Sequence, residues 1–149
     1  MACDRVQARG LVFVNAMVPA LGETPGEWWE ATGAVDARVA AAKAGGYSVE
    51  FDVKTYFLHD LGAEDAASVL GNPGYESDIA FRQPCDFARW PDVPTAAVVG
   101  RDDRLFPVEF QRRVLQERAG IDATVISGGH LLALANPDEL VEVLLKLAT

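Results

Sequence analysis

Three short apolar runs along the chain have the pattern of buried β-strands. The first is Leu11 to Ala16, and the others are Thr95 to Gly100 and Ala123 to Ser127. They are rich in β-branched residues, and glycine or proline residues stand close to their ends. Continuous apolar runs of this length are typical of strands that are covered on both faces of a sheet. The sequence therefore predicts three such strands.

Helices are expected between and after the last two strands. Val108 to Arg118 follows Pro107, which suits a first helical position, and precedes Gly120, which suits a helix end. The last helix would start at Asn136 to Glu139, a segment that offers an N-cap, a proline and an acidic residue in the first turn. Strands that alternate with helices imply a parallel sheet, because parallel neighbours need a long crossover connection. The predicted fold class is α/β.

Residues 19–92 interrupt this alternation. Glycine and proline residues are frequent there and surround short apolar patches. Ala31 to Ala44 and Ala63 to Leu70 have the composition of helices. We interpret residues 19–92 as an insertion whose short helices lie over one end of the sheet. Residues 1–149 together are expected to form one domain or a portion of one.

The chain is acidic. Its 149 residues include 13 Lys and Arg against 22 Asp and Glu, so the formal net charge is −9. Half of the residues are apolar, which excludes intrinsic disorder and allows a sizeable core. The negative charge disfavours nucleic acids and anionic membrane surfaces as partners.

Other features of the sequence argue against membrane insertion, secretion and metal binding. No run approaches the roughly 20 apolar residues of a membrane span, and the first ten residues lack the apolar core of a signal peptide. A cytoplasmic location is therefore expected. Cys3 and Cys85 are too few for a disulfide framework and have no Cys or His companions at zinc-ligand spacing. We expect free thiols and no bound metal.

The loops that follow the second and third strands carry a carboxylate and an imidazole. Asp102 and Asp103 come after Gly100, and His130 comes after two glycines. The carboxyl ends of parallel strands meet at one edge of the sheet, where ligands and catalytic groups gather. A carboxylate that binds Nδ1 of a histidine leaves Nε2 free to act as a base toward a hydroxyl group. The pattern predicts two members of a hydrolytic triad.

These segments resemble the C-terminal half of the α/β-hydrolase superfamily, particularly its small bacterial esterases and the plant methylesterase and hydroxynitrile lyase group. The likeness rests on Leu11 to Pro19, on the loop Gly100-x-x-Asp103-x-x-x-Pro107, and on Gly128-Gly129-His130, which occur in the family order. The resemblance implies a partial α/β-hydrolase fold of about three parallel strands, flanking helices and a helical cap insertion. It implies that Asp103 is the triad acid, with Asp102 as the nearby competitor, and that His130 is the base.

By the same resemblance, residues 19–92 form the cap that shapes the substrate pocket. Adjacent residues on a regular element cannot both face one way, so only one of the two neighbouring tryptophans is expected to line that pocket. His59, beside Asp60, is expected to be an exposed histidine without a catalytic role. The candidate pocket residues are Trp28, Trp29, Tyr56, Phe57 and Leu58.

The sequence lacks the nucleophile of this family. The family order is nucleophile, acid and histidine, with the nucleophilic serine on a Gly-x-Ser-x-Gly turn that this chain does not contain. The nearest string, Gly46 to Glu50, lacks the second glycine and lies in the insertion, so Ser48 is not expected to be the nucleophile. Cys85 has neither such a turn nor an oriented base. We expect a truncated family member that does not turn over an ester alone, and the nucleophile stays open among Ser, Asp and Cys.

Two functions follow. The first is serine esterase-like hydrolysis of a small ester or related acyl substrate, without a cofactor, once an N-terminal half supplies the nucleophile. The second is a non-catalytic module, derived from the same fold, that binds a small ligand or a partner protein. In either case strand 11–16 would present an unpaired apolar edge, which we expect to pair with an N-terminal half or with a second copy of the chain.

Overall fold

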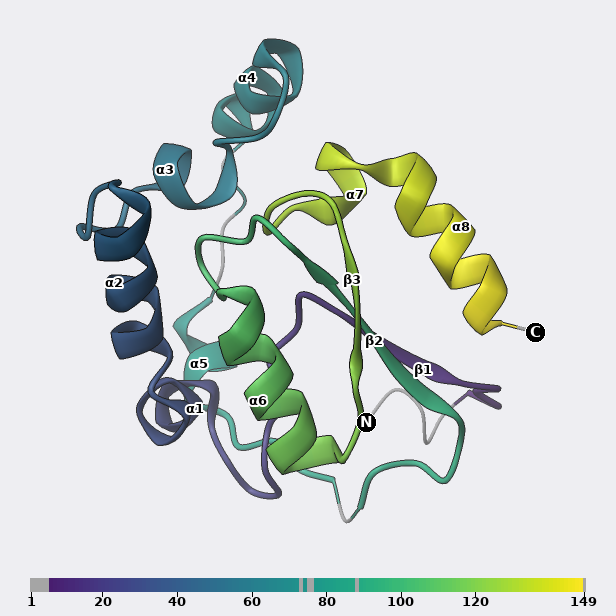
Figure 1. The fold of residues 1–149 in the computed structure, drawn as a ribbon. Helices are drawn as coiled ribbons and strands as arrows, with labels where there is room; N and C mark the ends of the chain where they lie inside the picture. The colour runs from purple at the N-terminus through teal and green to yellow at the C-terminus, as the bar shows by residue number, and fades with distance from the viewer. Residues whose placement is uncertain (1–5, 73, 75–76, 88, 149) are drawn as a thin grey trace.

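The computed structural model describes residues 6–72, 74, 77–87 and 89–148, and it contains a parallel three-stranded sheet (Figure 1). The strands are β1 (Leu11–Val14), β2 (Thr95–Gly100) and β3 (Ala123–Ile126), in the spatial order β1-β2-β3. Phe13 lies opposite Ala97, and Val99 lies opposite Val125. The predicted α/β class, with three parallel strands, is confirmed.

Helices cover both faces of the sheet. Helix α6 (Val108–Ala119) lies against one face, where it packs on Ala97 and Val99 of β2. Helix α8 (Pro137–Leu147), preceded by the short α7 (Leu132–Ala135), lies against the other face and packs on Val98 (Figure 1). Successive residues of β2 therefore face opposite layers, and this explains why all of its central residues are apolar.

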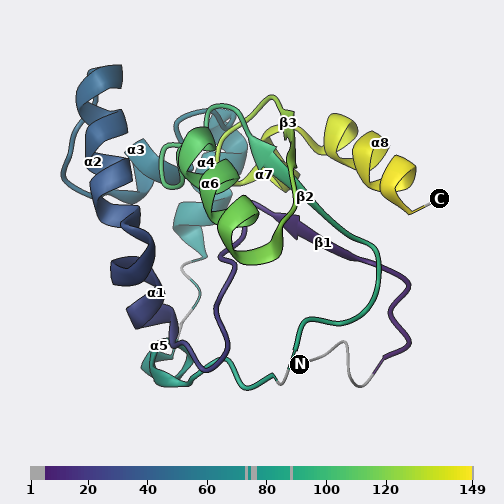
Figure 2. The same cartoon turned by 60° about the horizontal axis from the view of Figure 1, so that its bottom comes forward.

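The segment between β1 and β2 is helical, as the sequence predicts. It contains α1 (Pro25–Thr32), α2 (Ala34–Gly45), α3 (Val53–Phe57), α4 (Ala63–Gly71) and α5 (Asp78–Arg82). Helices α1, α2 and α5 lie on the side of the molecule opposite α8 (Figures 1 and 2). The single helix predicted for Ala31 to Ala44 is wrong in detail, because Gly33 adopts a left-handed conformation, with φ of 68°, that ends α1 and starts α2.

An ion pair and a hydrogen bond connect α1 and the chain before it to α6. Arg118 and Glu23 form a two-pronged ion pair, and Arg113 donates to the carbonyl of Thr32 at 2.6 Å. Trp28, on α1, is buried, and its indole N–H donates to the carbonyl of Val18 at 3.0 Å. The helical segment is therefore anchored to the sheet layer through α6.

Two strand ends and one helix cap differ from their predictions for local reasons. β1 ends at Val14 rather than Ala16, because Asn15 has a φ of 43°, which breaks the extended conformation. β3 ends at Ile126, one residue before the predicted Ser127. Asn136 precedes α8, but its side chain donates to the carbonyl of Ser127 and to Glu139 instead of accepting from the helix N-terminus. Asn136 is therefore the N-cap residue and Pro137 lies in the first turn, as predicted, but the side-chain cap hydrogen bond is absent.

The sheet has one strand with a free side. In the part of the chain that the structure describes, β1 pairs only with β2. None of the described helices is long and apolar enough to cross a membrane.

Candidate active site

The ends of all three strands come together at one edge of the sheet. The end of β2 approaches the loop after β3 so closely that a Cβ atom at Gly100 would lie 2.6 Å from the carbonyl oxygen of Gly129. Gly128 follows β3 with a φ of 121°, a conformation that side chains other than glycine rarely adopt. These glycines allow the two loops that carry the candidate acid and base to lie side by side.

His130 and Asp103 are in direct contact at this edge. Nδ1 of His130 lies 2.8 Å from Oδ2 of Asp103, whose side chain has no exposed surface. The side chain of His130 is 15% exposed. Asp102, the competing carboxylate, is exposed and instead accepts a 3.3 Å hydrogen bond from the backbone N–H of Gly128.

The surroundings of Asp103 determine which nitrogen of His130 carries the proton. Oδ1 of Asp103 accepts from the backbone N–H groups of Leu105 and Phe106, at 2.8 and 2.9 Å, and Oδ2 accepts from Gln111 at 3.1 Å. A carboxylate that accepts this many hydrogen bonds is an ionised acceptor, so Nδ1 of His130 is the donor. In neutral His130 the lone pair therefore lies on Nε2, which no described residue hydrogen-bonds. This is the tautomer that a general base needs.

Two aromatic rings enclose the imidazole. The ring of Phe57, at the end of α3, lies edge-on to that of His130 with centroids 4.9 Å apart. The ring of Phe106 does the same from the loop after β2, at 5.2 Å. Apolar rings on two sides restrict the rotation of the imidazole and reduce its contact with water.

The five residues predicted to line a pocket have different surroundings in the structure. Phe57 alone among these five residues makes a ring contact with His130. Trp28 is 1% exposed and packs against Phe106 and Phe110, and Trp29 lies beside it, half-buried. Tyr56 and Leu58 are buried as well. Their assignment as pocket walls stays a prediction.

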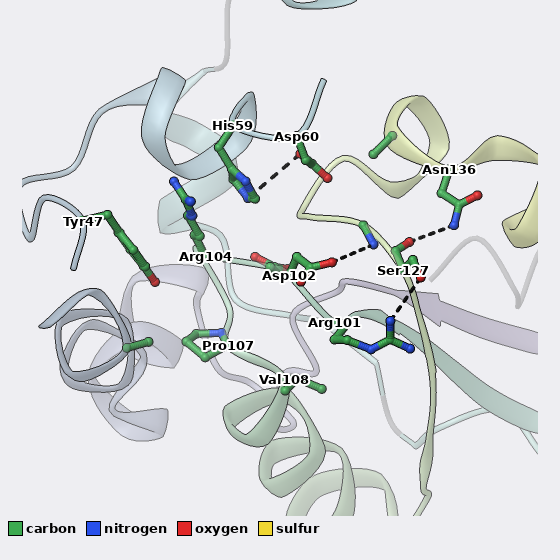
Figure 3. Close-up of a pocket in the computed structure, with 14 residues that line it drawn as sticks. Tyr47, His59, Asp60, Arg101, Asp102, Arg104, Pro107, Val108, Ser127 and Asn136 are labelled. Atoms are coloured by element: carbon green, nitrogen blue, oxygen red, sulfur yellow. Dashed lines mark hydrogen bonds and ion pairs between the residues drawn. The ribbon is translucent and has the colours of Figure 1, made fainter. Parts of the chain in front are cut away.

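A polar cavity of about 610 Å³ lies next to the Asp103 loop (Figure 3). It is bounded by the loops after β2 and β3, by the loop between α3 and α4, and by the end of α2. The charged and hydrogen-bonding residues that line it are Tyr47, His59, Asp60, Arg101, Asp102, Asp103, Arg104, Ser127 and Asn136. Burial raises the pKa of Tyr47, and the neighbouring Tyr56 adds to this, so the Tyr47 hydroxyl stays protonated at neutral pH.

The expectation that His59 is exposed is wrong. It is not an exposed residue, because only 12% of its side chain is accessible and Nε2 is buried without a hydrogen-bond partner among the described residues. Asp60, next to it, accepts a hydrogen bond from the backbone N–H of Gly129 and so ties the helical segment to the His130 loop. The sequence carries no local signal for the bond between Asp60 and Gly129, because 69 residues separate them.

Comparison with known families matches this arrangement to one of them. The model of the family described as "Alpha/beta hydrolase family" matches residues 1–143. This chain belongs to the α/β-hydrolase family. Comparison of this α/β-hydrolase chain with curated protein sequences gave no match.

Solved structures share the fold of this α/β-hydrolase chain. Polyneuridine aldehyde esterase superposes with a TM-score of 0.70 at 17% identity, over 99% of this chain and 65% of that one. A pyrethroid hydrolase from Sphingobium faniae JZ-2 superposes with a TM-score of 0.63 at 18% identity, over 94% of this chain and 60% of that one. This α/β-hydrolase chain thus spans less than two thirds of the length of either structure.

Proposed function

We propose that this chain supplies the acid and the base of an esterase-like α/β-hydrolase. Asp103 is the acid and His130 is the base. The observation that carries the proposal is the 2.8 Å contact between the buried Asp103 carboxylate and Nδ1 of His130. The expected substrate is a small ester or related acyl compound, as in the esterase and the pyrethroid hydrolase to which the fold is similar.

The proposed reaction is an acyl transfer in two steps. Nε2 of His130 takes the proton of the nucleophile's hydroxyl as its oxygen bonds to the acyl carbon, and the protonated imidazole then gives that proton to the departing alcohol. In the second step His130 takes a proton from water as the water oxygen bonds to the acyl carbon. The imidazolium then gives that proton to the nucleophile's oxygen as its bond to the acyl carbon breaks, which releases the acid product and restores the nucleophile's hydroxyl and neutral His130. Asp103 keeps Nδ1 protonated and stabilises the imidazolium that forms in both steps.

The nucleophile would come from a segment that pairs with the free side of β1. Two features support this inference: β1 has only one described neighbour, and the sequence contains no Gly-x-Ser-x-Gly turn. A parallel strand at that position would end at the same edge of the sheet as Asp103 and His130. Without it, we expect the 149-residue chain to leave esters unhydrolysed and to self-associate through β1. Residues 19–92 would then form the cap over the substrate.

The test is hydrolysis of short p-nitrophenyl esters together with labelling by a fluorophosphonate, which reacts with activated serines. The 149-residue chain should be inactive and unlabelled. The gene product that extends through any in-frame upstream Gly-x-Ser-x-Gly segment should be active and labelled, and His130→Ala should abolish both signals. Activity that survives His130→Ala, or labelling of the 149-residue chain, would contradict the proposal.

A second candidate function is non-catalytic binding of a small polar ligand, and the cavity in Figure 3 favours it. Arg104, His59 and Asp60 line this cavity and require no nucleophile. Acetate and ethylammonium are suitable probes for its cationic and anionic side chains. Binding would shift the amide resonance of Gly129, which contacts Asp60, but not that of Gly71 in α4. If neither probe shifts Gly129, this function is excluded for small ions of both signs.

A further inference from the structure

The side chain of Asn15 links the ends of all three strands. It is 6% exposed and directly follows β1. Its Nδ2 atom donates to the carbonyl oxygens of Gly129 and His130, both at 2.9 Å. Its Oδ1 atom accepts from the backbone N–H of Gly100 at 2.8 Å. One buried amide therefore satisfies backbone groups in the β2 end and in the loop that carries the proposed base.

Gln111, on α6, links Asn15 to Asp103 through its side-chain amide. Its side-chain nitrogen lies 2.7 Å from the carbonyl oxygen of Phe106, 3.1 Å from Oδ2 of Asp103 and 3.4 Å from Oδ1 of Asn15. Because all three neighbours are oxygens, the amide has one favourable orientation, with its N–H groups toward them. Gln111 is 4% exposed, so these bonds form out of contact with water.

These contacts close a ring. It runs from Asn15 to Gln111, from Gln111 to Oδ2 of Asp103, from Asp103 to Nδ1 of His130, and from the His130 carbonyl back to Asn15. Within the ring, the side chains of Gln111 and Asp103 each bond two other side chains, and the His130 backbone completes the circuit. The backbone at Asn15 is also unusual, since its φ of 43° lies in a region that costs free energy for residues other than glycine. The hydrogen bonds of the ring offset that cost.

We propose that Asn15 and Gln111 are positioning residues that hold His130 and Asp103 in register. Asn15 fixes the backbone of the His130 loop, and Gln111 fixes the carboxylate to which the imidazole donates. The catalytic meaning of this inference rests on the proposed function. Its test does not, because it reads the imidazole of the full 149-residue chain and needs neither a nucleophile nor a substrate.

The first measurement uses the unmodified chain. The side-chain amide protons of Asn15 and Gln111 should exchange with deuterated water at least about tenfold more slowly than those of Gln116 and Asn72. Gln116 is exposed on the same helix as Gln111, and Asn72 is exposed after α4. Equal exchange rates in the two pairs would show that the ring does not persist in solution and would overturn the proposal.

The second measurement asks whether the ring controls the tautomer of His130. The sequence has two histidines, so a His59→Gln variant assigns the ring-nitrogen resonances. In Asn15→Ala and in Gln111→Met, the Nδ1 proton of His130 should exchange with water about fivefold faster or more, the factor that corresponds to one lost hydrogen bond. The nitrogen shifts should move toward a mixture of tautomers. Gln116→Met and Asn72→Ala, both at exposed positions, are matched controls and should leave the resonances of His130 unchanged.

The outcomes separate this inference from the proposed function. Unchanged proton exchange at His130 in a folded Asn15→Ala or Gln111→Met chain would overturn the positioning role, whatever the hydrolysis assays give. Faster exchange in these variants would support it even if the longer gene product hydrolysed no ester. If Asn15→Ala fails to fold, Gln111→Met and the exchange rates of the unmodified chain decide.

Discussion

Arg118 and Glu23 are 95 residues apart in the sequence and form a two-pronged ion pair that joins the end of α6 to the chain before α1. The Glu23 side chain is only 9% exposed. Burial alone would raise the pKa of its carboxyl group. Hydrogen bonds from Arg118 and from the backbone of Ala20 outweigh this effect and hold the pKa below its ordinary value of 4.5.

The Glu23–Arg118 pair should therefore make stability depend on acid pH. Because the folded-state pKa is lowered, the stabilisation is fully present above about pH 4.5 and is lost as the pH falls through the folded value. Glu23→Gln should reduce the free energy of unfolding by about 1–3 kcal/mol at neutral pH, and the difference from the unmodified chain should shrink in acid. Urea unfolding across this pH range measures both. Glu117→Gln, which removes an exposed pair with Arg113, should cost less than about 1 kcal/mol.

Substitutions at Asp103 and at its neighbour Asp102 should differ in their effect on ester hydrolysis. In a chain extended by a segment that supplies the proposed nucleophile, Asp103→Asn should lower kcat for ester hydrolysis about 10³- to 10⁴-fold, because an amide no longer fixes Nδ1 of His130 as the donor. Asp102→Asn should change kcat little, since Asp102 is bonded to Gly128 rather than to the imidazole. A larger loss of kcat for Asp102→Asn than for Asp103→Asn would show that Asp102, and not Asp103, is the acid.

The close approach of two loops at Gly100 should make that position intolerant of any side chain. A Cβ atom there would meet the backbone carbonyls of Gly128 and Gly129. Gly100→Ala should therefore lower the free energy of unfolding by about 1–3 kcal/mol or more and perturb the resonances of His130. Gly71→Ala is the matched control, because a Cβ atom at Gly71, in α4, meets no atom of the described residues within 4 Å. This change should stabilise the chain by about 0.5–1 kcal/mol.

The two adjacent tryptophans should differ in their contribution to stability. Trp28 is fully packed against Phe106 and Phe110, whereas Trp29 is half-buried. Trp28→Ala should cost about 3–5 kcal/mol and Trp29→Ala about 1–2 kcal/mol, both measured by urea unfolding. Equal losses would mean that the two side chains share the core equally. A change in ester KM confined to Trp29→Ala would identify Trp29 as the residue that meets the substrate.

The sheet and the Asp103–His130 contact were predictable because their signals are local. Each strand is a short apolar run, and each of the two side chains follows the end of such a run, so the convergence of parallel strand ends places them together. Asn15, Gln111 and Asp60 were not predicted, since their bonds join residues far apart in the sequence. The environment of His59 was also missed, because the loops that bury it lie elsewhere in the chain.

The same distant contacts bear on how the chain folds. From β2 to the end of α8 the elements are consecutive and pack on their neighbours, whereas the bond from Gly100 to Asn15 spans 85 residues. Closing the loop between Asn15 and Gly100 lowers the conformational entropy of the chain before the contacts of β1 can form. We therefore expect β1 to join the sheet late in folding and to leave it early in unfolding. Until β1 docks, Asn15 cannot reach the His130 loop. A newly made or partly unfolded chain therefore lacks an ordered His130 loop, and the proposed chemistry at this site requires that β1 has already joined the sheet.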